Sequence, residues 1–205
     1  MVNDVERVQA GFAGLCEPLH DAFAWAEAMR RVRLKELASR SEYTWLATHT
    51  VRGFAHLRLQ DMDLGPWCLA GNHASNGALW LTDGEYRARI LHAASDSDVP
   101  APGVNYARRA FYRNTPLPLQ DTLMGPANDR LLILWTTDPE DGAPSFRVVR
   151  PIGNWKWGTR AITDLDFVLP RYAEELADLR FEPSDEGLDL FVPNEEEGDA
   201  GGLPG

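Results

Sequence analysis

Residues 78–92, with the sequence ALWLTDGEYRARILH, constrain the fold more than any other stretch of the chain. They hold two runs of strand-forming residues on either side of Asp83 and Gly84. Asp-Gly between such runs is a strong signal for a type I′ hairpin turn, because both central residues need positive φ and glycine adopts it without strain. The sequence therefore predicts a β-hairpin with a two-residue loop, in which Trp80 lies opposite Arg87.

The predicted hairpin has two chemically different faces, because successive side chains of a strand point to opposite sides. One face is mostly apolar and carries Leu79, Leu81, Tyr86, Ala88 and Ile90. The other face carries Trp80, Arg87 and Arg89, with Thr82 and Glu85 near the turn. We expect helices to cover the first face, and we expect the second face either to meet solvent or to bind a partner. A slip of one residue in the register would exchange the two faces.

Helical patterns precede the hairpin and strand patterns follow it. Residues 3–60 repeat apolar side chains at spacings of three and four, which is typical of helices, with an interruption at Pro18. Further strands are expected at 67–70, 130–137 and 145–150, a strand or helix at 161–169, a helix at 170–181 and a short strand at 188–192. The predicted fold class is α+β, with N-terminal helices packed on one face of an antiparallel β-meander and a further C-terminal helix.

The chain is long enough, at 205 residues, for one domain with a substantial core. We expect a single α+β domain over residues 1–192, in which 1–60 form the helical part and 61–192 form the sheet part. The remaining residues 193–205, PNEEEGDAGGLPG, are acidic and rich in glycine. Such a composition is typical of a disordered tail.

Composition indicates an ordinary soluble protein, with 44% hydrophobic and 25% charged residues. No apolar run approaches the roughly 20 residues that a membrane-spanning helix needs. The N-terminus lacks the basic and then apolar layout of a signal peptide. The sequence therefore predicts a cytoplasmic protein with no membrane partner.

The formal net charge of −11 limits the classes of partner. Broad, sequence-independent binding to nucleic acid relies on an excess of Lys and Arg, which this acidic chain does not have. Nucleic acid is therefore a disfavoured partner, although the overall charge does not exclude a local basic site.

A polar and aromatic stripe is expected on the helix predicted within residues 41–59. Trp45, His49, Arg52 and His56 are spaced at i, i+4, i+7 and i+11, which places them on one helix face. An acid–base histidine beside an anion-holding arginine makes His49, Arg52 and His56 candidate catalytic residues. His49 and His56 lie two turns apart, about 10 Å, so these two alone do not suit one metal ion. The alternative is a helix face whose polar side chains hydrogen-bond to the sheet.

Arginines alternate with aromatic residues in two further segments, 106–113 and 155–160. The candidate binding residues there are Arg108, Arg109, Tyr112, Arg113, Trp155 and Trp157, which join Trp80, Arg87 and Arg89 of the hairpin. Aromatic rings and guanidinium groups together suit nucleobases, nucleotides or acidic peptides. The alternative is that the aromatic rings fill the edge of the core while the arginines pair with the surplus of Asp and Glu.

Motifs that would identify a cofactor, a metal site or a catalytic mechanism are missing from the sequence. It has no GxGxxG segment opening a helix, no phosphate-binding P-loop, no GxSxG elbow, no HExxH pair and no set of zinc-binding cysteines. Cys16 and Cys68 lie far apart in the sequence, and we expect both to be buried, reduced thiols. We therefore predict no metal and no cofactor.

The leading functional hypothesis is a non-enzymatic binding or regulatory protein that acts through a protein partner or through self-association. It would use the Arg- and Trp-rich sheet face, because Trp and Arg are enriched where protein interfaces are strongest, and the chain has seven tryptophans. One alternative is a hydrolase or nuclease that acts on a phosphate-bearing substrate with His49, Arg52 and His56. Another is a nucleic-acid-binding module that uses residues 106–113.

Overall fold

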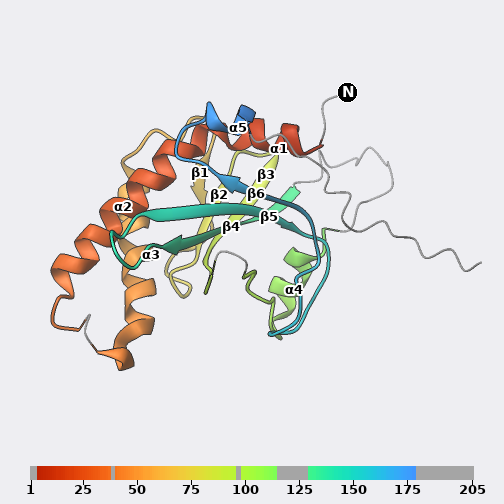
Figure 1. Cartoon of the computed structure of the whole chain (residues 1–205). Helices are drawn as coiled ribbons and strands as arrows, with labels where there is room; N and C mark the ends of the chain where they lie inside the picture. Colours follow the sequence, from red (N-terminus) through yellow and green to blue (C-terminus); the bar gives the residue numbers. More distant parts are fainter. Residues whose placement is uncertain (1–3, 38–39, 96–97, 115–128, 179–205) are drawn as a thin grey trace, which may run out of the picture.

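The computed structural model describes residues 4–37, 40–95, 98–114 and 129–178, apart from the side chains of Ser41 and Thr44. Its centre is a six-stranded sheet with helices on both sides (Figure 1). One face is covered by α1 (Asp4–Phe12), α2 (Cys16–Arg33) and α3 (Thr44–Gln60), and part of the other is covered by α4 (Tyr106–Tyr112). Shorter helical segments are η1 (Ala13–Leu15), η2 (Ser41–Tyr43) and α5 (Glu175–Asp178). This arrangement confirms the predicted α+β class.

The sheet keeps its strands in the order of the sequence. They are β1 (Cys68–Ala70), β2 (Leu79–Thr82), β3 (Tyr86–His92), β4 (Asp129–Thr137), β5 (Pro144–Pro151) and β6 (Thr163–Leu169). All neighbouring strands are antiparallel except β3 and β4, which run parallel. The expected meander order is therefore present with one parallel step. Its cause is a crossover, in which the chain leaves β3, forms α4 over one face and enters β4 in the same direction.

The hairpin of β2 and β3 has a longer turn than the predicted two-residue loop. Thr82 pairs with Arg87, and Trp80 lies opposite Arg89 rather than opposite Arg87. The predicted register is therefore wrong by two residues. A shift of two residues leaves every side chain on its own face, so Trp80, Arg87 and Arg89 still share one side of the sheet.

Side-chain hydrogen bonds explain the longer turn. The Asp83 carboxylate accepts the backbone N–H groups of Glu85 and Tyr86, at 2.9 and 2.7 Å. The Thr82 hydroxyl donates to the Tyr86 carbonyl oxygen at 2.7 Å. Among the described non-glycine residues only Asn76 has positive φ, so Asp83 does not adopt the conformation that a type I′ turn requires. An aspartate that bonds the backbone two residues ahead stabilises a wider turn instead.

The core between the helices and the sheet is rich in aromatic rings. Phe12 of α1 packs edge-on against Trp67 and Tyr86, with ring centroids 4.8 and 5.9 Å apart. Phe23 of α2 packs against Trp135 of β4 at 5.1 Å. The sheet side of this core includes Leu79, Leu81, Tyr86, Ala88 and Ile90, the apolar face predicted for the hairpin. The N-terminal helices thus cover that face because they present apolar side chains at helical spacing.

A second core lies on the opposite face of the sheet, beneath α4. Its buried residues include Leu132, Leu134 and Val149 of the sheet, Phe111 and Tyr112 of α4, and Trp155. Asn114, just after α4, anchors this layer, because its side chain bonds both backbone groups of Arg130 and the carbonyl oxygen of Pro151. The Trp80 side of the sheet is therefore partly covered rather than wholly open.

Three local expectations change in the structure. Pro18 does not separate two helices, because α2 begins two residues earlier and proline fits the first turn of a helix. Residues 161–169 contain a strand, β6. The predicted C-terminal helix is short within the described chain, and the rest of it, the strand expected at 188–192 and the tail at 193–205 lie outside the described residues.

Cys16 is buried in α2, as expected, and Cys68 is exposed on β1. The prediction of a buried thiol is wrong for Cys68, because β1 is the first strand at the edge of the sheet. Neither thiol forms a disulfide. Of the helices in the part of the chain that the structure describes, none combines the length and the apolar character needed to cross a membrane.

Candidate functional site

Three arginines from three different elements are close enough for the charges of two of them to act on the third. Arg52 belongs to α3, Arg89 to β3 and Arg108 to α4, and we refer to them as the arginine cluster. Strand alternation turns Arg89 toward the α4 side of the sheet. Asn105 caps α4 by accepting the backbone N–H of Arg108 at 3.0 Å, so Arg108 lies in the first turn of that helix.

The positive charges of Arg108 and Arg52 both act on the Arg89 guanidinium group. Burial lowers the pKa of Arg89, and the positive charges of Arg108 and Arg52 lower it further. Burial also lowers the pKa of Arg52. Like charges in a partly buried place repel each other, so this cluster is unfavourable unless something compensates it.

The arginine cluster has no acidic compensation within the described residues. None of its three members lies within 4.0 Å of a described Asp or Glu oxygen. The Nε atom of each is buried and has no hydrogen-bond partner there. Guanidinium groups bind carboxylates and phosphates through paired N–H donors. The cluster can therefore receive an anionic group.

An aromatic wall lies beside the arginine cluster. The Arg87 and Arg89 guanidinium carbons lie 4.9 and 5.2 Å from the ring centroid of Trp80. Trp80 also packs edge-on against Phe111 of α4 at 5.0 Å. Gly71 has φ of +74°, and a Cβ atom there would lie 3.1 Å from Trp80 Cδ1, so the glycine lets its loop pass over the ring. A ligand at the cluster would therefore meet both charge and a flat apolar surface.

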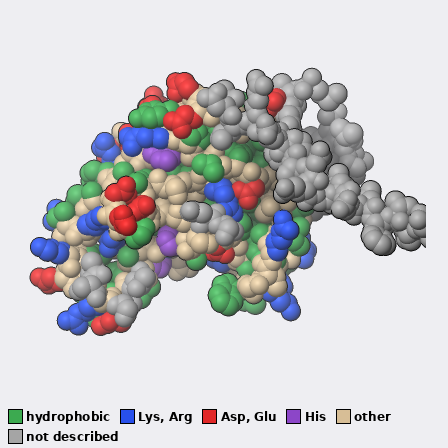
Figure 2. Space-filling view, in the orientation of Figure 1, with side chains coloured by type: hydrophobic (Ala, Val, Ile, Leu, Met, Phe, Trp, Pro, Cys, Tyr) green, Lys and Arg blue, Asp and Glu red, His purple; other side chains and the backbone are tan. Residues whose placement is uncertain are grey.

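The histidines near the arginine cluster are held by neighbouring groups. Arg52 Nη2 lies 2.8 Å from His49 Nδ1, so the guanidinium donates to the imidazole. The His56 and His73 rings stack with centroids 3.8 Å apart, and burial and then the His73 charge lower the pKa of His56. Burial and then Arg52 also lower the pKa of His92. Figure 2 shows histidine side chains near the lower edge of the molecule, between its two lobes.

The predicted helix stripe and the predicted arginine–aromatic segments therefore meet in part. Arg52 of the stripe joins Arg89 of the hairpin and Arg108 of α4, whereas Trp45 of the stripe is exposed, packed only on its neighbour His49 among the described ring contacts. Tyr112 is buried, and its hydroxyl donates to the Pro100 carbonyl oxygen at 2.9 Å.

The remaining predicted residues lie around α4 rather than in the cluster. Trp155 is buried in the second core and donates its indole N–H to the Val99 carbonyl oxygen. Trp157 is 91% exposed, and Arg109 is exposed on α4. Arg113 lies beside the Asn154 amide. Figure 2 shows hydrophobic side chains at the tip of the lobe that carries α4, with Lys and Arg side chains beside them.

Sequence reasoning did not single out His92, His73 or Gly71, although all three adjoin the predicted residues. His92 is the last residue of β3 and packs its ring against Trp135 at 4.6 Å. The sequence did contain a signal for His92. This histidine follows Tyr86, Ala88 and Ile90 at every second position, so a polar side chain ends the apolar face of the strand. For the ranges that the structure covers, no group of three or more His, Cys, Asp or Glu side chains is placed to hold a metal ion.

Comparisons with known proteins give no relative from which a function can be transferred. No family model, no curated protein and no solved structure matches the chain. Any functional conclusion therefore rests on the site itself.

Proposed function

We propose that this protein is a non-enzymatic binding protein that recognises an acidic segment of a protein partner at the arginine cluster. The observation that carries the proposal is the convergence of Arg52, Arg89 and Arg108 without a described carboxylate partner. A buried donor without a partner costs about 1–3 kcal/mol, and more when it is charged. An acidic ligand that satisfies these donors removes that cost and the mutual repulsion, so the free energy released favours binding.

A protein partner is supported by large apolar side chains that are exposed near α4 and in the segment after β5. Val104 and Tyr106, at the start of α4, are 94% and 86% exposed, and Trp157 is similarly exposed. Large apolar side chains beside arginines are typical of the strongest positions in protein interfaces. The net charge of −11 argues against a long nucleic-acid backbone as the partner, because such binding needs many cationic contacts.

The proposal is tested with a triple variant, Arg52→Gln, Arg89→Gln and Arg108→Gln. Its matched control changes three exposed arginines outside the cluster, Arg33→Gln, Arg58→Gln and Arg160→Gln, so that both variants alter the net charge equally. Hexaglutamate serves as the acidic probe in titration calorimetry at low salt. We expect the cluster variant to lose about tenfold or more in affinity and the control to keep the wild-type affinity.

Stability separates this binding role from a structural role. Removing uncompensated buried charges leaves the free energy of unfolding of the cluster variant unchanged or raises it, whereas structural arginines would make the variant less stable. Size exclusion with light scattering and a pull-down with the whole chain then tests the natural partner. A strict monomer that retains no partner at any concentration, and no hexaglutamate, contradicts the proposal.

A second candidate is hydrolysis of a phosphate-bearing substrate, and one observation favours it. His49 lies 2.8 Å from Arg52, which places an acid–base group beside an anion-binding group. Turnover of bis(p-nitrophenyl) phosphate that disappears in His49→Ala would support this function. Binding of hexaglutamate without turnover would favour the first proposal.

A further inference from the structure

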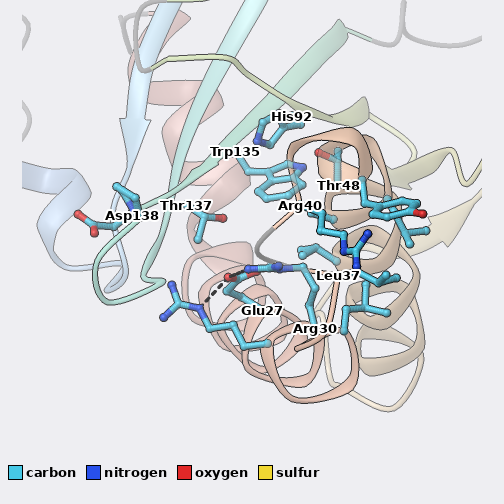
Figure 3. A pocket seen from close by; sticks show the side chains of 16 residues that line it. Glu27, Arg30, Leu37, Arg40, Thr48, His92, Trp135, Thr137 and Asp138 are labelled. Atoms are coloured by element: carbon cyan, nitrogen blue, oxygen red, sulfur yellow. Dashed lines mark hydrogen bonds and ion pairs between the residues drawn. The ribbon is translucent and has the colours of Figure 1, made fainter.

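A pocket of about 310 Å³ lies on the other side of the sheet from α4, between α2, α3 and the ends of β3 and β4. The residues that line it come from all four elements and include Arg30, Thr48, His92 and Trp135. Figure 3 shows Trp135 beneath His92, with Thr48 and Thr137 on either side and Arg30 across the opening. This volume lies at the small end of the range for small-molecule sites.

Glu27 does not leave a free negative charge in this pocket. Its carboxylate accepts hydrogen bonds from Arg30 Nε at 2.7 Å, Arg30 Nη2 at 2.6 Å and Arg31 Nε at 2.9 Å (Figure 3). Burial raises the pKa of Glu27, but the two arginines outweigh it and the net shift is downward. The glutamate is therefore ionised and compensated by two arginines, so it does not call for a cationic ligand.

Trp135, which lines the pocket, carries a buried donor that has no described acceptor. The side chain is only 2% exposed, and its indole Nε1–H has no acceptor among the described residues. An indole N–H is a donor only, so the missing partner must supply an acceptor atom. An unsatisfied buried donor costs about 1–3 kcal/mol in the free protein.

The rest of the lining selects the kind of acceptor. Arg30, Arg31 and Arg40 contribute three positive charges against two negative charges, from Glu27 and Asp138. The pocket wall is otherwise built largely from apolar and aromatic side chains, namely Leu34, Leu37, Tyr43, Leu46, Val51 and Trp135. A mainly apolar wall that also includes Thr48, His92 and Thr137, with a cationic surplus and one unsatisfied donor, favours a compact apolar molecule that bears an anionic acceptor.

We propose that this pocket binds a small organic carboxylic acid in its ionised form, with a carboxylate oxygen accepting the indole N–H of Trp135. The apolar body of the ligand packs against the leucines between α2 and α3. Arg40, which also forms a loose, exposed pair with Glu42 at 3.9 Å, adds electrostatic attraction. This site differs from the arginine cluster in that Trp135 and Arg89 face opposite sides of the sheet, although the charge of Arg52 acts on His92 of the pocket lining. The two proposals are tested through different residues, Trp135 and Arg40 here and the three cluster arginines above, so the failure of one can be told from the failure of the other.

Nuclear magnetic resonance of the indole ¹H–¹⁵N groups tests the proposal on the full chain. The probes are benzoate, cyclohexanecarboxylate and the neutral isostere benzamide. The Trp135 signal is assigned with Trp135→Phe, and the signal of the exposed Trp157 is the internal control. We expect a saturable shift of the Trp135 signal with both acids, no shift for Trp157, and at least about tenfold weaker binding of benzamide.

A second variant keeps the test decisive if Trp135→Phe does not fold. Arg40→Gln changes a side chain that is 63% exposed, so it leaves the fold intact. This variant is expected to weaken benzoate binding several-fold and to leave benzamide binding unchanged. The proposal is overturned if none of the probes shifts the Trp135 signal saturably. It is also overturned if the Trp135 indole N–H contacts only a bound water when the acids are present.

Discussion

Gly11 allows α1 to lie directly on the sheet. A Cβ atom at this position would be 2.6 Å from Cε2 of Tyr86, closer than real side chains approach. Tyr86 is 2% exposed, and its hydroxyl accepts a hydrogen bond from Arg7 Nη1 at 2.7 Å, so the ring has little room to move. The Gly11 carbonyl oxygen also accepts the indole N–H of Trp67. The helix position is therefore fixed from two sides.

Gly11→Ala is expected to lower the free energy of unfolding. The alanine gains about 1 kcal/mol of helix propensity, but overpacking against a fixed ring costs about 1–3 kcal/mol. Gly53→Ala in α3 is the matched control, because nothing lies within 4 Å of its added Cβ atom. That control should gain up to about 1 kcal/mol. Urea denaturation followed by circular dichroism measures both variants. If Gly11→Ala were more stable than wild type, the Tyr86 ring would have to move aside, and its position would not be fixed.

At the scale of elements, alternation and periodicity in the sequence were enough to assign most faces correctly. The faces of β2 and β3 follow from strand alternation. The mispredicted turn shifts the register by two residues, an even number, so every side chain stays on its predicted face. The turn itself was mispredicted because the Asp83 carboxylate bonds the backbone, a local competition that the Asp-Gly signal does not reveal.

The parallel pairing of β3 and β4 was not predictable from the sequence. The weak patterns of residues 95–103 and 114–129 indicate loops, and residues 106–113 indicate no more than a turn or two of helix, so the sequence does not by itself indicate a crossover. The short helix α4 is held by its Asn105 cap and by Asn114, whose side chain bonds to Arg130 and Pro151. These are tertiary contacts, and periodicity contains no information about them.

A network of charges joins α1 to strands β4, β5 and β6 of the sheet. Arg150 of β5 pairs with Asp4 of α1, with Asp129 of β4 and with Asp164 of β6. Arg7 pairs with Asp4 and Asp129 as well. Hydrogen bonding to Arg150 is the main cause that lowers the pKa of Asp4 in the fold. The network therefore stabilises the fold only while its carboxylates are ionised.

Arg150→Met is expected to reduce the free energy of unfolding at neutral pH by about 2 kcal/mol. Hydrogen bonds to charged groups contribute about 1.5–3 kcal/mol each, and the partly exposed partners reduce that value. The contribution of Asp4 is fully present above its ordinary pKa of 3.8 and is lost as the pH falls through its lower folded value. The difference between wild type and variant should therefore shrink in acid, as urea denaturation across this pH range measures.

The control for this network is Arg171→Met. Arg171 pairs with Asp21, and both side chains are about half exposed. Exposed pairs contribute about 0–1 kcal/mol, so this variant should stay close to wild type at every pH. An Arg150→Met variant with the same small effect would show that the shared carboxylates contribute little to stability.

At the scale of the whole molecule, the candidate site depends on three parts of the chain that the sequence keeps far apart. Arg52, Arg89 and Arg108 were each singled out from the sequence, but in separate patterns on a helix, a strand and a loop. Their convergence depends on how α3 and α4 lie on opposite faces of one sheet. The pocket around Trp135 was not predicted for the same reason. In the sequence Trp135 is one residue of a buried central strand, and the helices that complete the pocket are far away along the chain.

The sheet lies between two cores, and β4 contributes to both. Ile133 faces the N-terminal helices and Leu134 faces α4, so adjacent residues of one strand stabilise opposite layers. Both side chains are at most 2% exposed. Because each layer rests on the same strand, loss of packing in one layer weakens the support of the other.

Ile133→Ala and Leu134→Ala are therefore expected to destabilise the molecule as a whole. Each should cost about 2–5 kcal/mol, the usual range for such truncations in a packed core. Val168→Ala, at a side chain that is 55% exposed on β6, is the matched control and should cost about 0.5 kcal/mol or less. Urea unfolding is followed by far-ultraviolet circular dichroism and by tryptophan fluorescence, and the two transitions should coincide in every variant. Separate transitions in Leu134→Ala, with the helical signal lost at the wild-type midpoint, would mean that the α4 layer folds independently of the helices on the other face.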